Sequence, residues 1–145
     1  MFKHLLLPTD GSDLSLAAVR QGVRLAKESN SRITGVSVTP KFHVLTFNTA
    51  MIEGTKEVFL AESRAQAQGY LELLKKAADA EGVPCDIEVA VSDRPYEEII
   101  RIAEAKGCDL IVMASHGRQG AQALLLGSET QKVLTHTRIP VLVYR

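Results

Sequence analysis

The stretch FKHLLLPTDGS at residues 2–12 decides the fold class of this chain. Residues 2–8 are predicted to form the first strand, because three consecutive leucines are typical of a strand with both faces buried, as in a parallel sheet between two layers of helices. Asp10, Gly11 and Ser12 then predict a turn, and Ser12 is a favourable N-cap for a helix that runs to about residue 28. A doubly buried strand that leads directly into a helix predicts a βαβ unit.

The rest of the chain continues this alternation. Further strands are predicted in segments rich in β-branched and apolar residues: 32–39, 85–91, 110–114 and 139–144. Further helices are predicted from apolar spacing and start signals: 56–80, 95–106 and a segment that begins at 128. Ser128 and Gln131 have the spacing of a capping box, which makes Ser128 the predicted N-cap. Residues 41–55 have no clear period and are predicted to form a long loop.

Five strands and four helices in strict alternation predict one α/β domain over residues 1–145. Right-handed crossovers place helices on both faces of a five-stranded parallel sheet of the Rossmann-like type. Such sheets bind ligands outside the carboxyl ends of their strands, at the crevice where the strand order reverses. We therefore expect the functional residues in the loops after the first, second and fourth strands.

Composition and charge remove several classes of function. Lys plus Arg and Asp plus Glu each number 17, so no basic field favours a nucleic acid or an anionic membrane. No apolar run approaches the roughly 20 residues of a membrane span, and residues 1–7 are too short for a secretory leader. Cys85 and Cys108 lie outside any metal or redox spacing and are expected to be buried packing residues. We expect a cytoplasmic protein that binds neither nucleic acid nor membrane and whose side chains form no direct metal site.

The segment 113–128 carries the strongest signal for a binding site. Two turns, one with Gly117 and one with Gly127, flank a hydrophobic stretch. Phosphate oxygens need several backbone N–H donors at close range, and glycine removes the Cβ that would block this approach. Gly127 and Ser128 also stand at a helix start, where unpaired N–H groups and the helix dipole favour an anion. Arg118 can add a charge-assisted contact.

Each of these residues also has an interpretation that involves no ligand. The chain contains neither a Walker A loop nor a dinucleotide glycine fingerprint, and glycines between a strand and a helix often serve turn geometry alone. Asp10 is a turn former and Val38 a core residue in this interpretation. Ser128 caps its helix, and His116 is a solvated loop histidine.

The residues quoted so far also carry a family resemblance over essentially the whole chain: Pro8-Thr9-Asp10 after the first strand, then Ser115-His116-Gly117, nine residues and Gly127-Ser128. This arrangement resembles the universal stress protein family, whose fold is of the adenine nucleotide α-hydrolase-like type. The nucleotide-binding branch of that family has the pattern G-x-x-G, nine residues, G-[S/T]. Gly117, Gly127 and Ser128 match this pattern, whereas Ala114 replaces the first glycine.

The resemblance implies a bound adenine nucleotide, namely ATP, with ADP and AMP as alternatives. With Arg118 added because of its charge, the predicted contact residues are Pro8, Thr9, Asp10, Val38, Met113, Ala114, Ser115, His116, Gly117, Arg118, Gly127, Ser128, Glu129 and Thr130. By resemblance, the first three line the adenosine side and Val38 meets adenine through its backbone. Residues 113–117 wrap the ribose and α-phosphate, and residues 127–130 hold the outer phosphates. Asp10 is suited to accept from ribose hydroxyls or to hold a magnesium ion through water.

The predicted function is that of an ATP-binding stress-response protein, a nucleotide-dependent switch or sensor without dedicated catalysis. The site loops contain no nucleophile and base at motif spacing, no Walker lysine and no pair of carboxylates. Two alternatives stay open. One is a slow ATPase or nucleotide hydrolase that uses Asp10, His116 and Arg118, and the other is a nucleotide-free interaction module in which the glycines serve only the fold.

The end of the chain, residues 140–145, is apolar and strongly β-forming, so that an exposed edge there would be sticky. In the family that the chain resembles, the last strand pairs antiparallel with its mate across a two-fold axis. The resemblance therefore implies a homodimer through the C-terminal strand. A monomer with a covered edge is the alternative.

Overall fold

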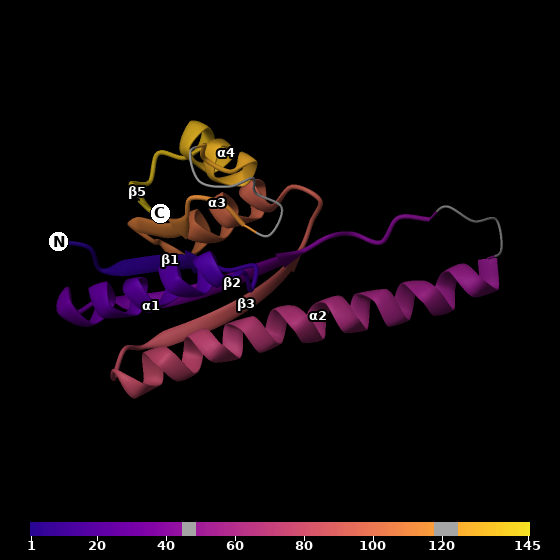
Figure 1. Ribbon diagram of the computed structural model, residues 1–145, viewed down its shortest axis with the longest axis horizontal. Coiled ribbons are helices and arrows are strands. Elements are labelled where there is room, and N and C mark those ends of the chain that lie inside the picture. Colours follow the sequence, from indigo (N-terminus) through magenta and orange to yellow (C-terminus); the bar gives the residue numbers. More distant parts are fainter. Residues whose placement is uncertain (45–48, 118–124) are drawn as a thin grey trace.

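A computed structural model of the chain describes residues 1–44, 49–117 and 125–145. Strands and helices alternate along these residues (Figure 1): β1 (His4–Pro8), α1 (Asp13–Glu28), β2 (Arg32–Thr39), α2 (Thr49–Ala80), β3 (Cys85–Val91), α3 (Pro95–Lys106), β4 (Leu110–Ala114), α4 (Ser128–His136) and β5 (Val141–Tyr144). No helix among them has the length and apolarity that a membrane crossing needs.

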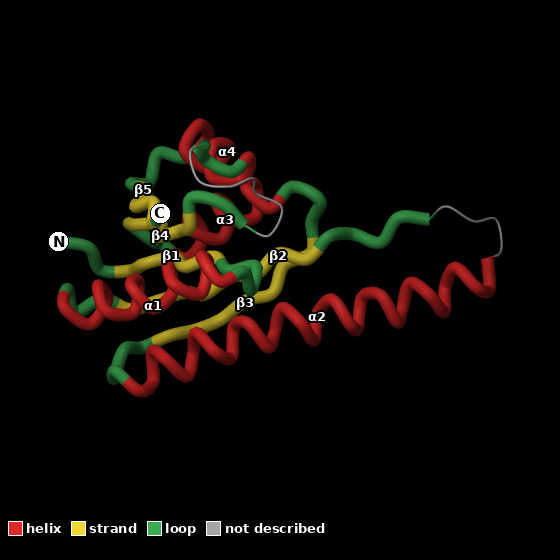
Figure 2. Tube along the Cα trace, viewed as in Figure 1, coloured by secondary structure: helices red, strands yellow, loops and turns green. Residues whose placement is uncertain are grey.

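The described strands form one parallel sheet of five strands in the order β3-β2-β1-β4-β5 (Figure 2). The chain moves outward from β1 to β3 and then returns to β4 on the other side of β1. The strand order therefore reverses between β1 and β4. This arrangement confirms the predicted five-stranded parallel α/β fold.

The three consecutive leucines of β1 show why both faces of the sheet are covered. Leu5 and Leu7 belong to the core beneath α1 and α2, whereas Leu6 belongs to the core beneath α3 and α4. All three side chains are 0% exposed. Complete burial of a leucine stabilises a fold by on the order of 2 kcal/mol, so this strand anchors both layers.

Several local predictions are confirmed. The Ser12 side chain caps α1 by accepting from the Ser15 amide at 3.3 Å. Pro95 starts α3, and Gly107 ends it with a left-handed φ of 71°. Cys108 is buried as predicted, whereas Cys85, also predicted to be buried, is only half-buried. Burial raises the pKa of both thiols to about 11, so both are protonated at neutral pH.

The predicted loop at 41–55 is wrong in its second half, because α2 begins at Thr49. Figure 1 shows the first part of α2 projecting beyond the sheet, with the segment after β2 beside it. Residues 54–58 are exposed, and Phe59 packs against Phe42 with ring centroids 5.5 Å apart. A helix needs an apolar stripe only where it packs on a core, so sequence periodicity could not reveal a start that lies outside the sheet.

Two strand ends also differ from the prediction. The first strand starts at His4 rather than at residue 2, and the last starts at Val141 rather than at residue 139. Pairing with a neighbouring strand sets these limits, and the sequence does not show the neighbour.

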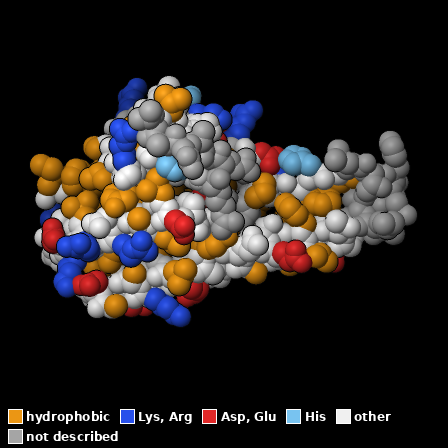
Figure 3. All heavy atoms as spheres, viewed as in Figure 1, with side chains coloured by type: hydrophobic (Ala, Val, Ile, Leu, Met, Phe, Trp, Pro, Cys, Tyr) orange, Lys and Arg blue, Asp and Glu red, His pale blue; other side chains and the backbone are white. Residues whose placement is uncertain are grey.

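Acidic and basic side chains are interspersed on the face drawn in Figure 3, without a large area of one sign.

Candidate functional site

A pocket of about 580 Å³ lies at the carboxyl edge of the sheet. Its walls come from the ends of β1, β2 and β4, from the loop after β3, and from the first turn of α4. This is the place where the strand order reverses, the usual ligand position in such sheets. The volume is within the range of small-molecule sites.

The pocket brings together most of the residues predicted from the sequence. Those that line it are Pro8, Thr9, Asp10, Val38, Met113, Ala114, His116, Gly117, Gly127, Ser128, Glu129 and Thr130. Ser115 does not line the pocket, and Arg118 lies outside the described residues. Loops that are about a hundred residues apart in sequence meet here because parallel strands all end at the same edge of the sheet.

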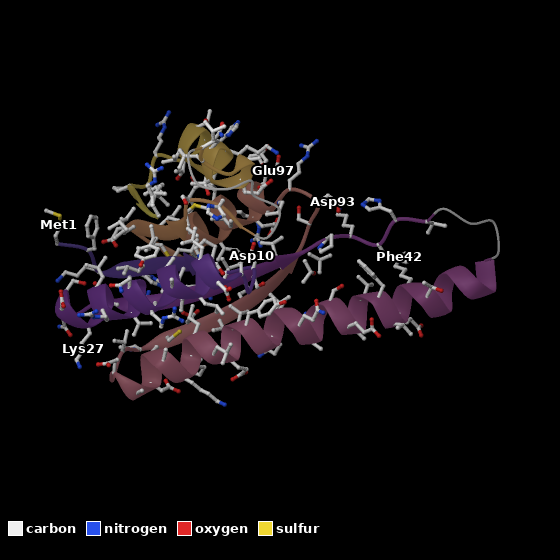
Figure 4. The ribbon with its side chains drawn as sticks, viewed as in Figure 1. Met1, Asp10, Lys27, Phe42, Asp93 and Glu97 are labelled. Atoms are coloured by element: carbon white, nitrogen blue, oxygen red, sulfur yellow. The ribbon has the colours of Figure 1, made fainter. Side chains whose placement is uncertain are left out.

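Asp10, labelled in Figure 4, serves the turn after β1 and also faces the loop after β4. One carboxylate oxygen accepts from the Ser12 amide at 3.0 Å, which is the turn contact expected for aspartate. The other oxygen lies so close to Gly117 that a Cβ at position 117 would overlap it. A side chain at position 117 would therefore displace the Asp10 carboxylate from its present place.

Thr9 lines the pocket, but its hydroxyl is used within the fold. The Ser15 hydroxyl donates to the Ser12 carbonyl at 3.1 Å, so the 2.9 Å contact between Thr9 and Ser15 has Thr9 as its donor. Thr9 Oγ1 also accepts from the Gly11 amide at 3.2 Å. These bonds hold the turn that contains Asp10. The Thr9 hydroxyl therefore has a structural role in the wall of the pocket.

Gly127 joins the two glycine-bearing turns to each other. Its amide donates to the Ser115 carbonyl at 2.6 Å, and this hydrogen bond holds the two turns together. Its φ of −62° is open to any residue. A Cβ at this position would lie 3.0 Å from His116 Cα, tighter than ordinary packing. The glycine is needed because the two turns pack backbone against backbone.

The predicted capping box at the start of α4 is also wrong. Gly127 is the N-cap and provides no side-chain cap, while Gln131 Nε2 donates to the Leu126 carbonyl at 2.7 Å. Ser128 is the first residue of the helix rather than its cap, and it lines the pocket. The first amides of a helix have no carbonyl of their own helix to bind, and they favour an anion.

Two side chains in the first turn of α4 hold neighbouring elements. Thr130 Oγ1 donates to the Ala114 carbonyl at 2.9 Å, and Thr130 is 2% exposed. Glu129 Oε2 accepts from the Tyr96 amide at 3.0 Å in the first turn of α3, whose N-cap Arg94 makes no side-chain cap bond. At both positions the backbone amide, rather than the side chain, is the group available to a phosphate.

Ala114, which stands in place of the first motif glycine, fits its position without strain. It ends β4, opposite Tyr144 of β5. Among the described residues, Asn30 is the one non-glycine residue with positive φ, so Ala114 has a backbone conformation that any residue can adopt. The methyl group is compatible with the turn that follows.

The sequence did not identify the other end of the pocket. Residues that line the pocket but were missed are Ser15, Val36, Pro40, Ser92, Asp93, Pro95 and Ile99. Val36 and Ile99 are buried apolar residues, whereas Ser92 and Asp93 form the loop after β3. Because β3 ends at the same edge of the sheet, the sequence could have indicated that the loop after β3 lies near the pocket. It did not show, however, that β3 is the neighbour of β2.

Asp93 ties this end of the pocket together. Its two carboxylate oxygens accept from the Lys41 amide at 3.0 Å and from His43 Nε2 at 2.8 Å. The hydrogen bond from His43 lowers the pKa of Asp93 below its ordinary value. The segment after β2 is thereby fastened to the loop after β3, and Figure 4 shows Asp93 at this junction.

Comparisons with known proteins agree with this geometry. The model of the universal stress protein family matches residues 1–145. Universal stress protein MJ0531 of Methanocaldococcus jannaschii is 34% identical over the whole of this chain and 83% of its own length. Universal stress protein YxiE of Bacillus subtilis is 33% identical over the full length of both chains.

Solved structures show the same fold. That of MJ0577 from Methanocaldococcus jannaschii superimposes with a TM-score of 0.85 at 28% identity, over 99% of this chain and 96% of that one. A universal stress protein in complex with cAMP has a TM-score of 0.69 at 23% identity, over 99% and 97%. One from Archaeoglobus fulgidus in complex with dAMP has a TM-score of 0.70 at 16% identity, over 100% and 98%. The chain belongs to the universal stress protein family.

Proposed function

We propose that this protein binds ATP in the pocket at the carboxyl edge of its sheet and acts as a nucleotide-dependent switch or sensor in the cytoplasm. The observation that carries the proposal is the convergence of the two glycine-bearing turns beside Asp10. Gly117 lies against the Asp10 carboxylate, and Gly127 packs on the His116 backbone. Such close backbone packing next to the start of α4 is typical of a phosphate-binding loop.

The triphosphate would lie at the start of α4. The Ser128 hydroxyl and the amides of Ser128, Glu129 and Thr130 are the proposed donors, together with Arg118. Asp10 would accept from the ribose hydroxyls. No lysine or arginine lines the pocket among the described residues, so the described part of the proposed phosphate site consists of the Ser128 hydroxyl, backbone amides and the helix dipole.

The adenine would lie at the opposite end, against the apolar side chains of Val36 and Ile99 and the backbone of Val38. Buried apolar walls with a few polar groups at the rim suit a purine ring. Two solved family members described as complexes with cAMP and dAMP support an adenine ligand for this fold. The choice of ATP rests on the donors at the start of α4.

Magnesium would come with the nucleotide. Among the residues that the structure describes, no three His, Cys, Asp or Glu side chains form a group that could hold a metal. Mg²⁺ usually keeps several waters and binds through one or two carboxylates and the substrate phosphates. Asp10 fits the carboxylate part of this arrangement, and the bound nucleotide would supply the rest.

Two measurements test the proposed function. Ligand released from the denatured purified protein should be identified by mass spectrometry as an adenine nucleotide. ATP at 100 times its Kd should raise the free energy of unfolding by about 2.7 kcal/mol. Absence of a bound nucleotide, combined with no ATP-dependent rise, would favour the nucleotide-free interaction module. Saturable phosphate release that is lost in Asp10→Ala would instead favour the slow hydrolase.

The dimer is part of the same proposal. β5 lies at the edge of the sheet, paired with β4 on one side, and Leu142 is 42% exposed. Pairing of β5 with its mate would cover this edge. The expected result is a dimer in light scattering that Leu142→Lys converts to a monomer, with Leu73→Lys, at an exposed position of α2, as the control. A wild-type monomer would refute this part.

A further inference from the structure

The turn after β1, which contains Asp10, lies against helix α2. Gly11 in this turn has a left-handed φ of 79°. A Cβ at Gly11 would overlap the ring of Tyr70 in α2, at the ring atoms Cδ1, Cε1 and Cζ. One edge of the Tyr70 ring is therefore in direct contact with the backbone of the turn.

The packing of α2 on the sheet holds Tyr70 at this place. Leu71 and Leu74, within one helical turn of Tyr70, are both 0% exposed. They pack so closely on β2 that a Cβ at Gly35 would lie 3.1 Å from Leu74 and 3.3 Å from Leu71. A closely packed core deforms little. The half-buried ring of Tyr70 is thus carried by a part of α2 that cannot easily withdraw from the turn.

Asp10 connects the same turn to the loop after β4. Its carboxylate occupies the place where a Cβ at Gly117 would lie. The turn therefore has a neighbour in α2 at Gly11 and a neighbour in the loop after β4 at Asp10. The hydrogen bonds donated by the Gly11 and Ser12 amides join residues within the turn and set its local shape. The contact with Tyr70 adds a support from a distant part of the chain.

There is space beside this contact into which the turn could move. A cavity of about 310 Å³ between the end of β2 and α2 is lined by both Asp10 and Tyr70. Loss of the ring atoms that meet Gly11 would extend this cavity to the backbone of the turn. Structure around a new cavity relaxes partly into it. Asp10 would then no longer be held at one position.

We propose that Tyr70 is a positioning residue for the nucleotide: its ring holds the turn after β1 where Asp10 reaches the ribose hydroxyls. This inference rests on the proposed function, because it needs the ribose at Asp10. Binding groups keep their geometry when the residues behind them are locked by packing. Tyr70 has this place behind Asp10, although Tyr70 itself does not line the nucleotide pocket.

The test compares Tyr70→Leu with Tyr70→Phe in isothermal titration calorimetry with ATP. Phenylalanine keeps the ring atoms that meet Gly11, whereas leucine lacks Cε1 and Cζ. Both substitutions remove the hydroxyl, so the difference between the two variants measures the ring contact alone. Tyr70→Leu should bind ATP about tenfold more weakly than Tyr70→Phe. Equal affinities would overturn the proposal.

A second ligand separates positioning from a general loosening of the fold. 2′,3′-Dideoxy-ATP lacks the ribose hydroxyls that Asp10 is proposed to bind. The two Tyr70 variants should bind it with affinities within about twofold of each other. The same should hold for ATP when both variants also carry Asp10→Ala, because the ribose contact is then already lost. A tenfold difference under either condition would show a purely structural role and would contradict positioning through Asp10.

The contact can also be tested from the side of the turn. Gly11→Ala adds a Cβ that overlaps the Tyr70 ring, so this variant should weaken ATP more than 2′,3′-dideoxy-ATP. It keeps the proposal testable if circular dichroism shows that Tyr70→Leu is unfolded, and equal losses for both ligands would refute it. If the wild-type protein binds no ATP, the proposed function is wrong as well. If it binds ATP and the Tyr70 variants do not differ, the positioning role alone is wrong.

Discussion

The two ends of the same sheet differ in what surrounds their polar groups. At the amino end, Arg32 Nε donates to His4 Nδ1 at 3.2 Å. Because this nitrogen accepts, the ring proton is on His4 Nε2, which donates to Thr34 Oγ1 at 2.7 Å. Thr34 donates to one oxygen of Asp86 at 2.7 Å, and Lys106 donates to the other at 3.1 Å. These groups satisfy one another.

At the carboxyl end, polar groups face the pocket. Ser128 lines it without capping its helix, and His116 lines it beside Gly117. The residue types at the two ends are similar, since each end contains a histidine, an aspartate and hydroxyl groups. The two ends differ in their hydrogen bonding. At the amino end, the row of hydrogen bonds from Arg32 through His4, Thr34 and Asp86 to Lys106 stabilises the fold, whereas unpaired backbone donors at the start of α4 are available to a ligand. We therefore expect changes at one end to affect stability and changes at the other to affect binding.

The largest effect is expected from Gly127→Val. The branched side chain would meet the His116 and Ser115 backbone at 3.0–3.2 Å and would force the two turns apart. ATP affinity should fall by at least about 100-fold in isothermal titration calorimetry, with the dimer retained. Gly69→Ala is the control, because a Cβ at this exposed position of α2 meets no atom within 4 Å. Unchanged ATP affinity in Gly127→Val would show that the phosphates do not bind at these two turns.

The second largest effect is expected from a substitution at the amino end of the sheet. Thr34→Val keeps the shape of the side chain but removes the hydroxyl between His4 and Asp86, and position 34 is 0% exposed. The buried His4 would lose its partner and the exposed Asp86 one of its hydrogen bonds, so the free energy of unfolding in urea should fall by about 1–3 kcal/mol. ATP affinity should stay the same. The same substitution at the exposed Thr135 is the control, and equal losses at both positions would contradict the role of the row.

Gly117→Ala is expected to have a moderate effect on binding. The added Cβ would overlap the Asp10 carboxylate, which must then turn away from the loop after β4. ATP affinity should fall by about tenfold, and the loss should be larger for ATP than for adenine alone, because Asp10 is proposed to contact the ribose. A loss of the same size for both ligands would show that the substitution distorts the whole pocket.

The smallest effect is expected from pH at the amino end. Burial, followed by the charge of Arg32, lowers the pKa of His4 despite the opposing charges of Asp86 and Asp109. The unfolded chain binds this proton more readily than the folded one. The stability from neutral His4 is therefore complete above about pH 6.5 and is lost as the pH falls below that value.

This pH dependence is measured by urea unfolding at pH 8 and at pH 5.5. His4→Gln removes the titrating group, so the difference in unfolding free energy between the two pH values should shrink. ATP affinity should not follow the same titration, because His4 lies at the opposite end of the sheet from the pocket. An undiminished difference in His4→Gln would assign the pH dependence to other groups.

The sequence predicted the sheet, three strands to the residue (32–39, 85–91 and 110–114) and the ends of α3. It did so because a strand with both faces buried and a helix with caps leave local patterns in the chain. The two glycines predicted for the site line the pocket, and their role in phosphate binding stays a prediction. Gly127 is needed to pack against His116, and this contact joins parts of the chain that no local pattern connects.

The chain by itself therefore determined the α/β class and the loops that form the pocket, because apolar period and turn residues act over a few neighbours. Only the tertiary structure decided which polar groups in these loops are bonded within the fold. Glu129 caps α3, Thr130 holds β4 and Asp93 fastens the segment after β2. Each of these bonds joins residues far apart in the sequence, so their partners exist only once the sheet has brought the elements together.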